Sequence, residues 1–204
     1  MSTLEPALRF IGKVVKSNSH ADYVVQVYGP ADVPQPPSPH DHAVGTFVAL
    51  PLEQGSLIGV IYDTILLNPE YGSLGPRLSP RAEAEVFSPD YLDEKATLVG
   101  VFVVGEVDTR GNPSHSLPPL AAQVDAEARV LTEEEVRRFH RMPDQPGMPR
   151  VGYLPRLLAR GGNLAAGLAQ LILARLGRLF PEQQGVLQVL RDNVAFRATV
   201  EVLR

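Results

Sequence analysis

The sequence contains no cysteine and no tryptophan, and only three of its 204 residues are lysines, at positions Lys13, Lys16 and Lys95. Without cysteine the chain cannot form a disulfide, a thiolate zinc site or a cysteine nucleophile. None of the lysines fits the phosphate-binding pattern G-x-x-x-x-G-K-[ST], because Lys13 is followed by Val14 and Ala7 stands where the first glycine should be. These absences exclude thiol chemistry and nucleotide hydrolysis by a phosphate loop.

Long apolar runs are also missing. The stretch at residues 98–104 is among the longest and is far shorter than the roughly 20 residues that span a bilayer. The first residues lack a basic segment followed by an apolar run, so no secretory signal is visible. We therefore expect a cytoplasmic protein.

Charge and proline content both change at residue 156. Residues 1–155 carry 12 Lys and Arg against 20 Asp and Glu, a net charge of −8, whereas residues 156–204 carry 7 against 3, a net charge of +4. Eighteen of the 19 prolines precede residue 156, and only Pro181 follows it. The acidic first region is a poor nonspecific nucleic-acid binder by itself, because neutralising phosphates requires clustered Lys or Arg.

The 19 prolines and 17 glycines exclude a long helical bundle as the whole structure. Between the turns that these residues form, apolar and β-branched runs predict six strands. A loop with five prolines at residues 29–39 interrupts them, and a second long loop covers residues 68–89. The predicted strands are residues 10–15, 23–28, 45–50, 57–67, 96–107 and 123–130.

A short helix is possible at residues 81–87 in the second long loop, where Ser79 could cap it, and the other predicted helices follow the last strand. Thr132-Glu133-Glu134-Glu135 is a capping box that opens a helix ending near His140, and this structural role explains the glutamate run better than catalysis does. Asn163 can cap a leucine-rich helix, and Pro181 is suited to the first position of another. Residues 196–202 then alternate apolar and polar, which predicts a terminal strand that pairs either within the chain or with another subunit.

The predicted fold class is α+β, with three parts. A six-stranded antiparallel β-barrel with its capped helix occupies residues 8–141, and a proline-rich linker occupies residues 142–155. A C-terminal extension of two helices and one strand occupies residues 156–204.

The order of the strands, the early proline loop, the long loop after the fourth strand and the capped helix resembles the HAS barrel. This barrel is shared by HerA-type DNA-translocating ATPases and the catalytic-ring subunits of F-type ATP synthases. The resemblance covers residues 8–140 and rests on five passages of this sequence: Ile11-Gly12-Lys13-Val14-Val15, residues 42–49, Gly59-Val60-Ile61-Tyr62-Asp63, residues 95–101 and Leu117-Pro118-Pro119.

In that family the barrel precedes a motor with a phosphate loop, which this sequence lacks. The resemblance implies that the barrel arranges subunits in a ring and offers a docking face to a NurA-type nuclease. We therefore expect a non-catalytic structural or adaptor subunit of a DNA-processing assembly. It would form a homo-oligomer, use no cofactor, and associate with a HerA-type ATPase or a NurA-type nuclease.

Several residue groups suggest other chemistry. His40-Asp41-His42 could bind a metal, since His40 and His42 of an extended segment project to one side, although histidines in such a loop are usually solvated. Ser114-His115-Ser116 with Asp108 suggests a hydrolase, but no G-x-S-x-G turn is present. Acidic residues that could serve a two-metal nuclease lack diagnostic spacing and are better explained as solvated surface: Asp63, Glu70, Asp90, Asp93 and Glu94.

The second long loop holds a basic and aromatic cluster of Tyr71, Arg77, Arg81, Phe87 and Tyr91. Long loops often carry binding function, and Tyr and Arg are typical interface anchors. The cluster is the predicted partner-binding site. The alternatives are local loop packing and single-strand nucleic-acid binding on an OB-like barrel, in which aromatic side chains stack on bases.

Overall fold

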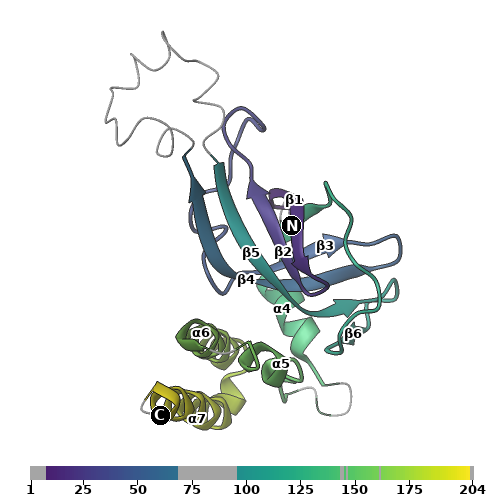
Figure 1. The fold of residues 1–204 in the computed structure, drawn as a ribbon. Helices are drawn as coiled ribbons and strands as arrows, with labels where there is room; N and C mark the ends of the chain where they lie inside the picture. The colour runs from purple at the N-terminus through teal and green to yellow at the C-terminus, as the bar shows by residue number, and fades with distance from the viewer. Residues whose placement is uncertain (1–7, 69–95, 143–144, 146, 161, 203–204) are drawn as a thin grey trace.

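The computed structural model describes residues 8–68, 96–142, 145, 147–160 and 162–202. Six antiparallel strands form a closed barrel (Figure 1), because the ladder that runs β1–β2–β5–β4–β3–β7 returns to β1. A two-residue strand, β6 (Pro113–Ser114), extends the sheet beyond β5. The barrel strands are β1 (Phe10–Ser19), β2 (Asp22–Val27), β3 (Phe47–Pro51), β4 (Ser56–Leu67), β5 (Ala96–Val107) and β7 (Glu127–Val130).

Closure of the barrel depends on close backbone approach at Gly12. This residue pairs with both Val27 of β2 and Ala128 of β7, and the β1 register shifts on either side of it. A Cβ atom at this position would collide with the backbone carbonyl of Gln26, so only glycine fits.

The sequence predicted all six barrel strands, and the antiparallel pairing of the first two is confirmed. The last strand is shorter than predicted. Asp125 has a φ of +65°, so residues before Glu127 turn instead of extending, and the side chain of Val124 is exposed. Strand β6 was not predicted, because two residues are too few to form a pattern.

Helix α4 (Glu133–His140) begins and ends where the capping box predicted. It is followed by α5 (Leu154–Leu158), α6 (Gly162–Leu179), the 3-10 turn η1 (Pro181–Gln183) and α7 (Gln184–Val202). The predicted strand at residues 196–202 is wrong, because these residues continue α7. The helix is apolar on two opposite sides, with Val194 and Ala198 packed inward and Phe196 exposed. Because apolar residues lie on two faces of this helix, its sequence shows the same alternation of apolar and polar residues as a strand.

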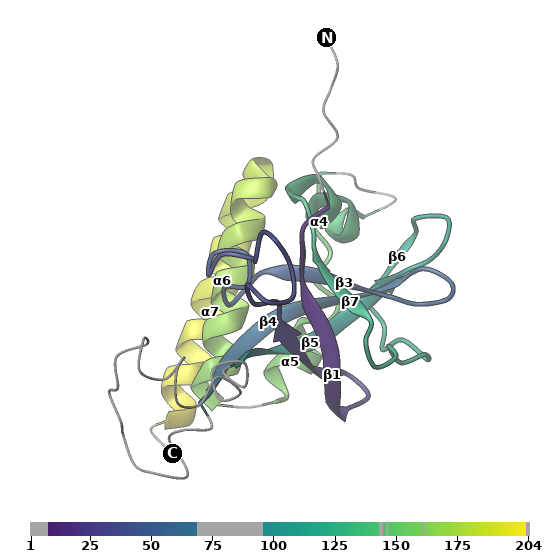
Figure 2. The ribbon, with the colours of Figure 1, turned by 90° about the horizontal axis from the view of Figure 1, so that it is seen from above.

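The barrel strands are buried on both faces where the helices cover them. In β3, Val48 and Leu50 point into the barrel, whereas Phe47 and Ala49 join a second core with the helices. Helix α6 supplies much of that second core and lies between the barrel and α7 (Figures 1 and 2). The described helices include none with the length and apolar character that a bilayer crossing requires.

Candidate functional site

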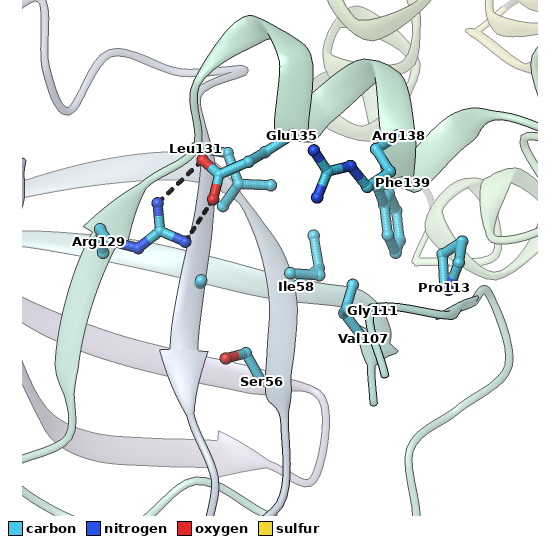
Figure 3. Close-up of a pocket in the computed structure, with 11 residues that line it drawn as sticks. Ser56, Ile58, Val107, Gly111, Pro113, Arg129, Leu131, Glu135, Arg138 and Phe139 are labelled. Carbon is cyan, nitrogen blue, oxygen red and sulfur yellow. Dashed lines mark hydrogen bonds and ion pairs between the residues drawn. The ribbon is translucent and has the colours of Figure 1, made fainter. Parts of the chain in front are cut away.

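An ion pair fastens α4 to the barrel. Arg129 of β7 donates from both terminal nitrogens to the Glu135 carboxylate, at 2.8 and 2.9 Å (Figure 3). The same carboxylate accepts hydrogen bonds from the Thr132 backbone N–H and hydroxyl, while Thr132 Oγ1 accepts from the Glu135 N–H. Burial alone would raise the pKa of Glu135, but the hydrogen bonds from Arg129 and Thr132 outweigh it and lower the pKa. Glu135 therefore serves as a structural anchor and not as a proton donor near neutral pH.

A small cavity lies between this ion pair and the edge of the barrel (Figure 3). Its volume is about 120 Å³, and its walls come from β4, β5, the β5–β6 turn, β7 and α4. That volume is below the roughly 300–1,000 Å³ of typical ligand pockets. It can accommodate a single side chain or a few water molecules. Residues that line it include Ser56, Ile58, Val107, Leu131, Arg138 and Phe139.

Three polar aromatic side chains form a buried cluster beneath α5. The Tyr153 hydroxyl donates to His140 Nε2 at 2.8 Å, and His140 Nδ1–H donates to the Val136 carbonyl at 2.8 Å. His115 accepts from the Gly152 N–H through Nδ1 and donates from Nε2 to the Phe139 carbonyl. Each imidazole therefore has both ring nitrogens engaged, which is compatible with its neutral form.

The environment of these histidines favours the neutral imidazole. Burial lowers the pKa of His115 to about 4. The hydrogen bond to the Phe139 carbonyl opposes this shift, and the nearby Arg150 and Arg156 cations add to it. Burial likewise lowers the pKa of His140 to about 3. We interpret the cluster as a core polar network that joins β6, α4 and α5.

The hydrolase interpretation does not agree with this geometry. His115 is held by two backbone groups, and the Asp108 carboxylate accepts from the Arg110 and Asn112 N–H groups in its own turn. Ser114 Oγ accepts from the Ser116 N–H. These interactions hold the turn and the core together and do not align a nucleophile with a base.

His40-Asp41-His42 lies in consecutive turns, not in an extended strand. The Asp41 carboxylate is already occupied, because it accepts from the Ser38 N–H and hydroxyl and pairs with Arg9. Within the described part of the chain, no three potential His, Asp or Glu ligands are gathered closely enough to hold a metal ion.

The predicted partner-binding residues Tyr71, Arg77, Arg81, Phe87 and Tyr91 lie outside the described residues, and so do Glu70, Asp90, Asp93 and Glu94. The structure therefore does not test the partner-binding prediction. Of the acidic group only Asp63 is described. It lies on β4, where its carboxylate accepts from the Thr64 N–H.

A second cationic contact joins the segment after α5 to the barrel. The Arg160 guanidinium pairs with Asp22 of β2 at 2.9 Å and lies over the rings of Tyr62 and Phe102, 4.4 and 5.0 Å from their centroids. The Tyr62 hydroxyl also donates to Asp22. Burial and the Asp22 carboxylate raise the pKa of Tyr62, which keeps this hydroxyl protonated as a donor. These contacts fix how the helices sit on the barrel.

The helical layer exposes apolar side chains beside the loop that precedes β3. Helix α6 contributes Leu164 and Leu171, which are 54% and 52% exposed. Together with Val44, Ala174 and Arg191 they line an open groove of about 480 Å³. This volume lies in the range of binding pockets, and the lining suits apolar side chains of a partner.

Helix α7 adds a further apolar surface, of which Val189 and Phe196 are 61% and 69% exposed. Sequence reasoning missed this surface, since it placed Phe196 in a terminal strand. The sequence did contain a signal for an exposed helix face, since residues 186, 189, 193, 196 and 200 are separated by alternately three and four positions. The surface residues of the helical layer are thus the strongest candidates for binding.

A comparison with curated proteins finds no match to this chain. A comparison with protein-family models gives one family, described as "Domain of unknown function (DUF8166)", which matches residues 3–203 and therefore almost the whole chain. The matched span includes both the barrel and the helical layer. The chain belongs to the DUF8166 family.

Proposed function

We propose that this protein is a non-catalytic assembly subunit that joins copies of itself or docks on a partner of a DNA-processing machine. The observation that carries the proposal is the set of exposed apolar side chains on α6 and α7. Monomeric proteins rarely expose large contiguous apolar surface without using it for binding. Here the exposed side chains belong to ordered helices whose opposite faces are buried, so they are available without unfolding the core.

The barrel supports the choice of partner class. It is closed, six-stranded and antiparallel, as expected from the resemblance to the HAS barrel. In that family the barrel arranges subunits and receives a nuclease. The finer proposal is therefore that this chain assembles with a HerA-type ATPase or a NurA-type nuclease, which would supply the chemistry.

The engagement of the polar side chains supports a role without catalysis. Polar groups of types that can serve catalysis are used internally: Glu135 holds α4, His115 and His140 hold the core, and Asp41 holds a turn. A docking role instead uses surface shape and apolar area, which the helical layer provides.

Size-exclusion chromatography with light scattering tests the proposal, on the protein alone and mixed with a HerA-type ATPase or a NurA-type nuclease. We expect a mass above that of the monomer or co-elution with one partner. The double variant Leu164→Asp/Leu171→Asp should weaken a complex that uses the α6 groove, because burying a carboxylate there is unfavourable. Arg110→Asp, at an exposed turn, is the matched control. A strict monomer that binds neither partner would refute the proposal.

A further inference from the structure

The exposed stripe on α7 has the spacing of a coiled-coil seam. Its members occupy positions 186, 189, 193, 196 and 200, so apolar residues recur every three and four positions except at Asn193. In heptad notation Val186, Asn193 and Val200 take position a, and Val189 and Phe196 take position d. Of these, Val186, Val189 and Phe196 are 49%, 61% and 69% exposed, and Val200 is partly buried. We call these five residues the α7 seam.

Helix α7 is already held in helical form by contacts on its other side. Leu187 and Val194 are 3% and 7% exposed and belong to the core shared with α6, and Ala198 packs against the same core. Binding of a partner helix therefore does not have to offset the entropy loss of folding α7 into a helix. A seam of about two heptads can then give more stable pairing than it would in an isolated peptide. Figure 1 shows α7 on the side of α6 away from the barrel, so a partner can approach it.

Asn193 limits what can cover the seam. It lies at a central a position, and its amide group both donates and accepts hydrogen bonds; in the monomer its Nδ2 donates to the Val189 carbonyl at 3.0 Å. A buried Asn at a single a position is characteristic of parallel two-stranded coiled coils, because only in-register parallel pairing places it opposite the same residue of the other helix. An apolar partner helix would leave this amide unsatisfied.

The charges beside the seam are complementary to the same charges on a second copy. Asp192 takes position g, and Arg197, five residues later, takes position e. In a parallel pair each g residue lies near the e residue five positions later on the other helix. Asp192 of each copy therefore faces Arg197 of the other. Antiparallel pairing would not bring these two positions together, since it places g beside g and e beside e.

We propose that the α7 seam binds a second copy of this chain through a parallel, in-register two-stranded coiled coil. This inference rests on the assembly role proposed above, and it identifies the surface through which two copies would associate. The two barrels then lie on opposite sides of the paired helices, which leaves the α6 groove of each copy open to another partner.

Sedimentation of the full chain at roughly 1–300 µM tests self-association, since small interfaces of this kind bind weakly. We expect a reversible dimer, and Phe196→Glu should raise its dissociation constant by at least about tenfold, because a carboxylate would be buried at the centre of the seam. Gln184→Glu introduces the same charge at an exposed position outside the seam and should leave the dimer intact. Circular dichroism verifies that both variants stay folded. A monomeric wild-type protein overturns the proposal, and so does a dimer that Phe196→Glu changes less than about twofold.

The absence of cysteine permits an independent test of orientation. Val189→Cys places one thiol at a d position, where parallel in-register pairing brings two copies together, so mild oxidation should give a covalent dimer in high yield. Gln188→Cys is the matched control and should react much less. Equal yields from the two variants overturn the seam. The DNA-processing role is tested separately, since Phe196→Glu can be monomeric and still co-elute with an ATPase or a nuclease.

Discussion

Arg160 and Asp22 are 138 residues apart in sequence and form an ion pair at 2.9 Å, which ties the end of α5 to strand β2. The side chain of Asp22 is 10% exposed, and that of Arg160 is 32% exposed. The guanidinium also lies against Tyr62 and Phe102. This pair therefore links the acidic barrel sequence to the arginine-enriched C-terminal sequence through one specific contact.

Arg160→Ala should lower the free energy of unfolding by about 2–3 kcal/mol, because it leaves the Asp22 carboxylate buried without its cation and removes the contacts with two aromatic rings. Urea denaturation followed by circular dichroism measures the change.

Two further variants identify the cause. Arg160→Ala/Asp22→Asn should be less destabilised than the sum of its single changes, since the two residues interact directly. Arg110→Ala removes an exposed arginine elsewhere and should change stability by no more than about 0.5 kcal/mol. Additive losses would mean that the ion pair contributes little to joining the helices to the barrel.

The two buried histidines should make the protein sensitive to mild acid. Their pKa values are about 4 for His115 and about 3 for His140 in the folded protein, below the ordinary value of 6.5. The unfolded chain therefore binds more protons as the pH falls below 6.5. The free energy of unfolding should decrease by up to about 1.4 kcal/mol per pH unit for each histidine, until the pH reaches the folded pKa.

The comparison between pH 6.5 and pH 5 is the most informative, because most carboxylates remain ionised there. His140→Gln should reduce the pH slope of stability in that interval, whatever its effect at pH 7. His40→Gln removes an exposed imidazole and serves as the control for the loss of a histidine. An unchanged slope in His140→Gln would show that this imidazole does not resist protonation in the folded state.

Much of the fold could be predicted because its determinants are local. Strand β5 is rich in β-branched residues along a single run of twelve, which is a strong local strand pattern. The capping box at Thr132 and Glu135 needs only four residues, so both ends of α4 could be predicted from sequence. Barrel closure by β2 and β5 was expected only from the family resemblance, since no local pattern specifies which distant strands pair.

The binding surface could not be predicted in the same way. Whether Phe196 is buried in a strand or exposed on a helix depends on how α7 packs against α6. The sequence alone is compatible with both the two-residue period of a strand and the 3.6-residue period of a helix. The roles of His115 and His140 likewise depend on Gly152 and Tyr153, which only the tertiary fold brings to them. Isolated polar residues therefore suggested chemistry that the structure assigns to packing.

The Arg129–Glu135 ion pair should contribute stability at neutral pH and not in acid. The pKa of Glu135 is lowered in the folded protein, so folding favours its ionised form, and this contribution is complete above the ordinary value of 4.5. It is lost as the pH falls through the lower folded value. Glu135→Gln retains a side chain that can complete the capping box but removes the charge, and should cost about 0.5–1 kcal/mol at pH 7.

The difference between wild-type protein and Glu135→Gln should shrink progressively as the pH falls below 4.5, measured by urea denaturation at each pH. Glu135→Ala also removes the capping hydrogen bonds and should cost about 1–2 kcal/mol at pH 7. Glu134→Gln changes an exposed neighbour in the same turn and is the control. A difference that persists undiminished at pH 3 would assign the effect to packing instead of charge.

Two glycine substitutions should have opposite effects on stability. Gly12→Ala introduces a Cβ that collides with the Gln26 carbonyl and with the Cα atom of Val27, both in the backbone of β2. We expect a loss of about 2 kcal/mol or more, since strands β1 and β2 must separate locally. Gly167→Ala is in the middle of α6, where a Cβ meets no atom within 4 Å. It should stabilise the protein by about 0.5–1 kcal/mol because alanine favours the helix. Thermal unfolding of both variants measures the two shifts, and a Gly12→Ala protein as stable as wild type would mean that barrel closure does not require the close approach of β1 and β2.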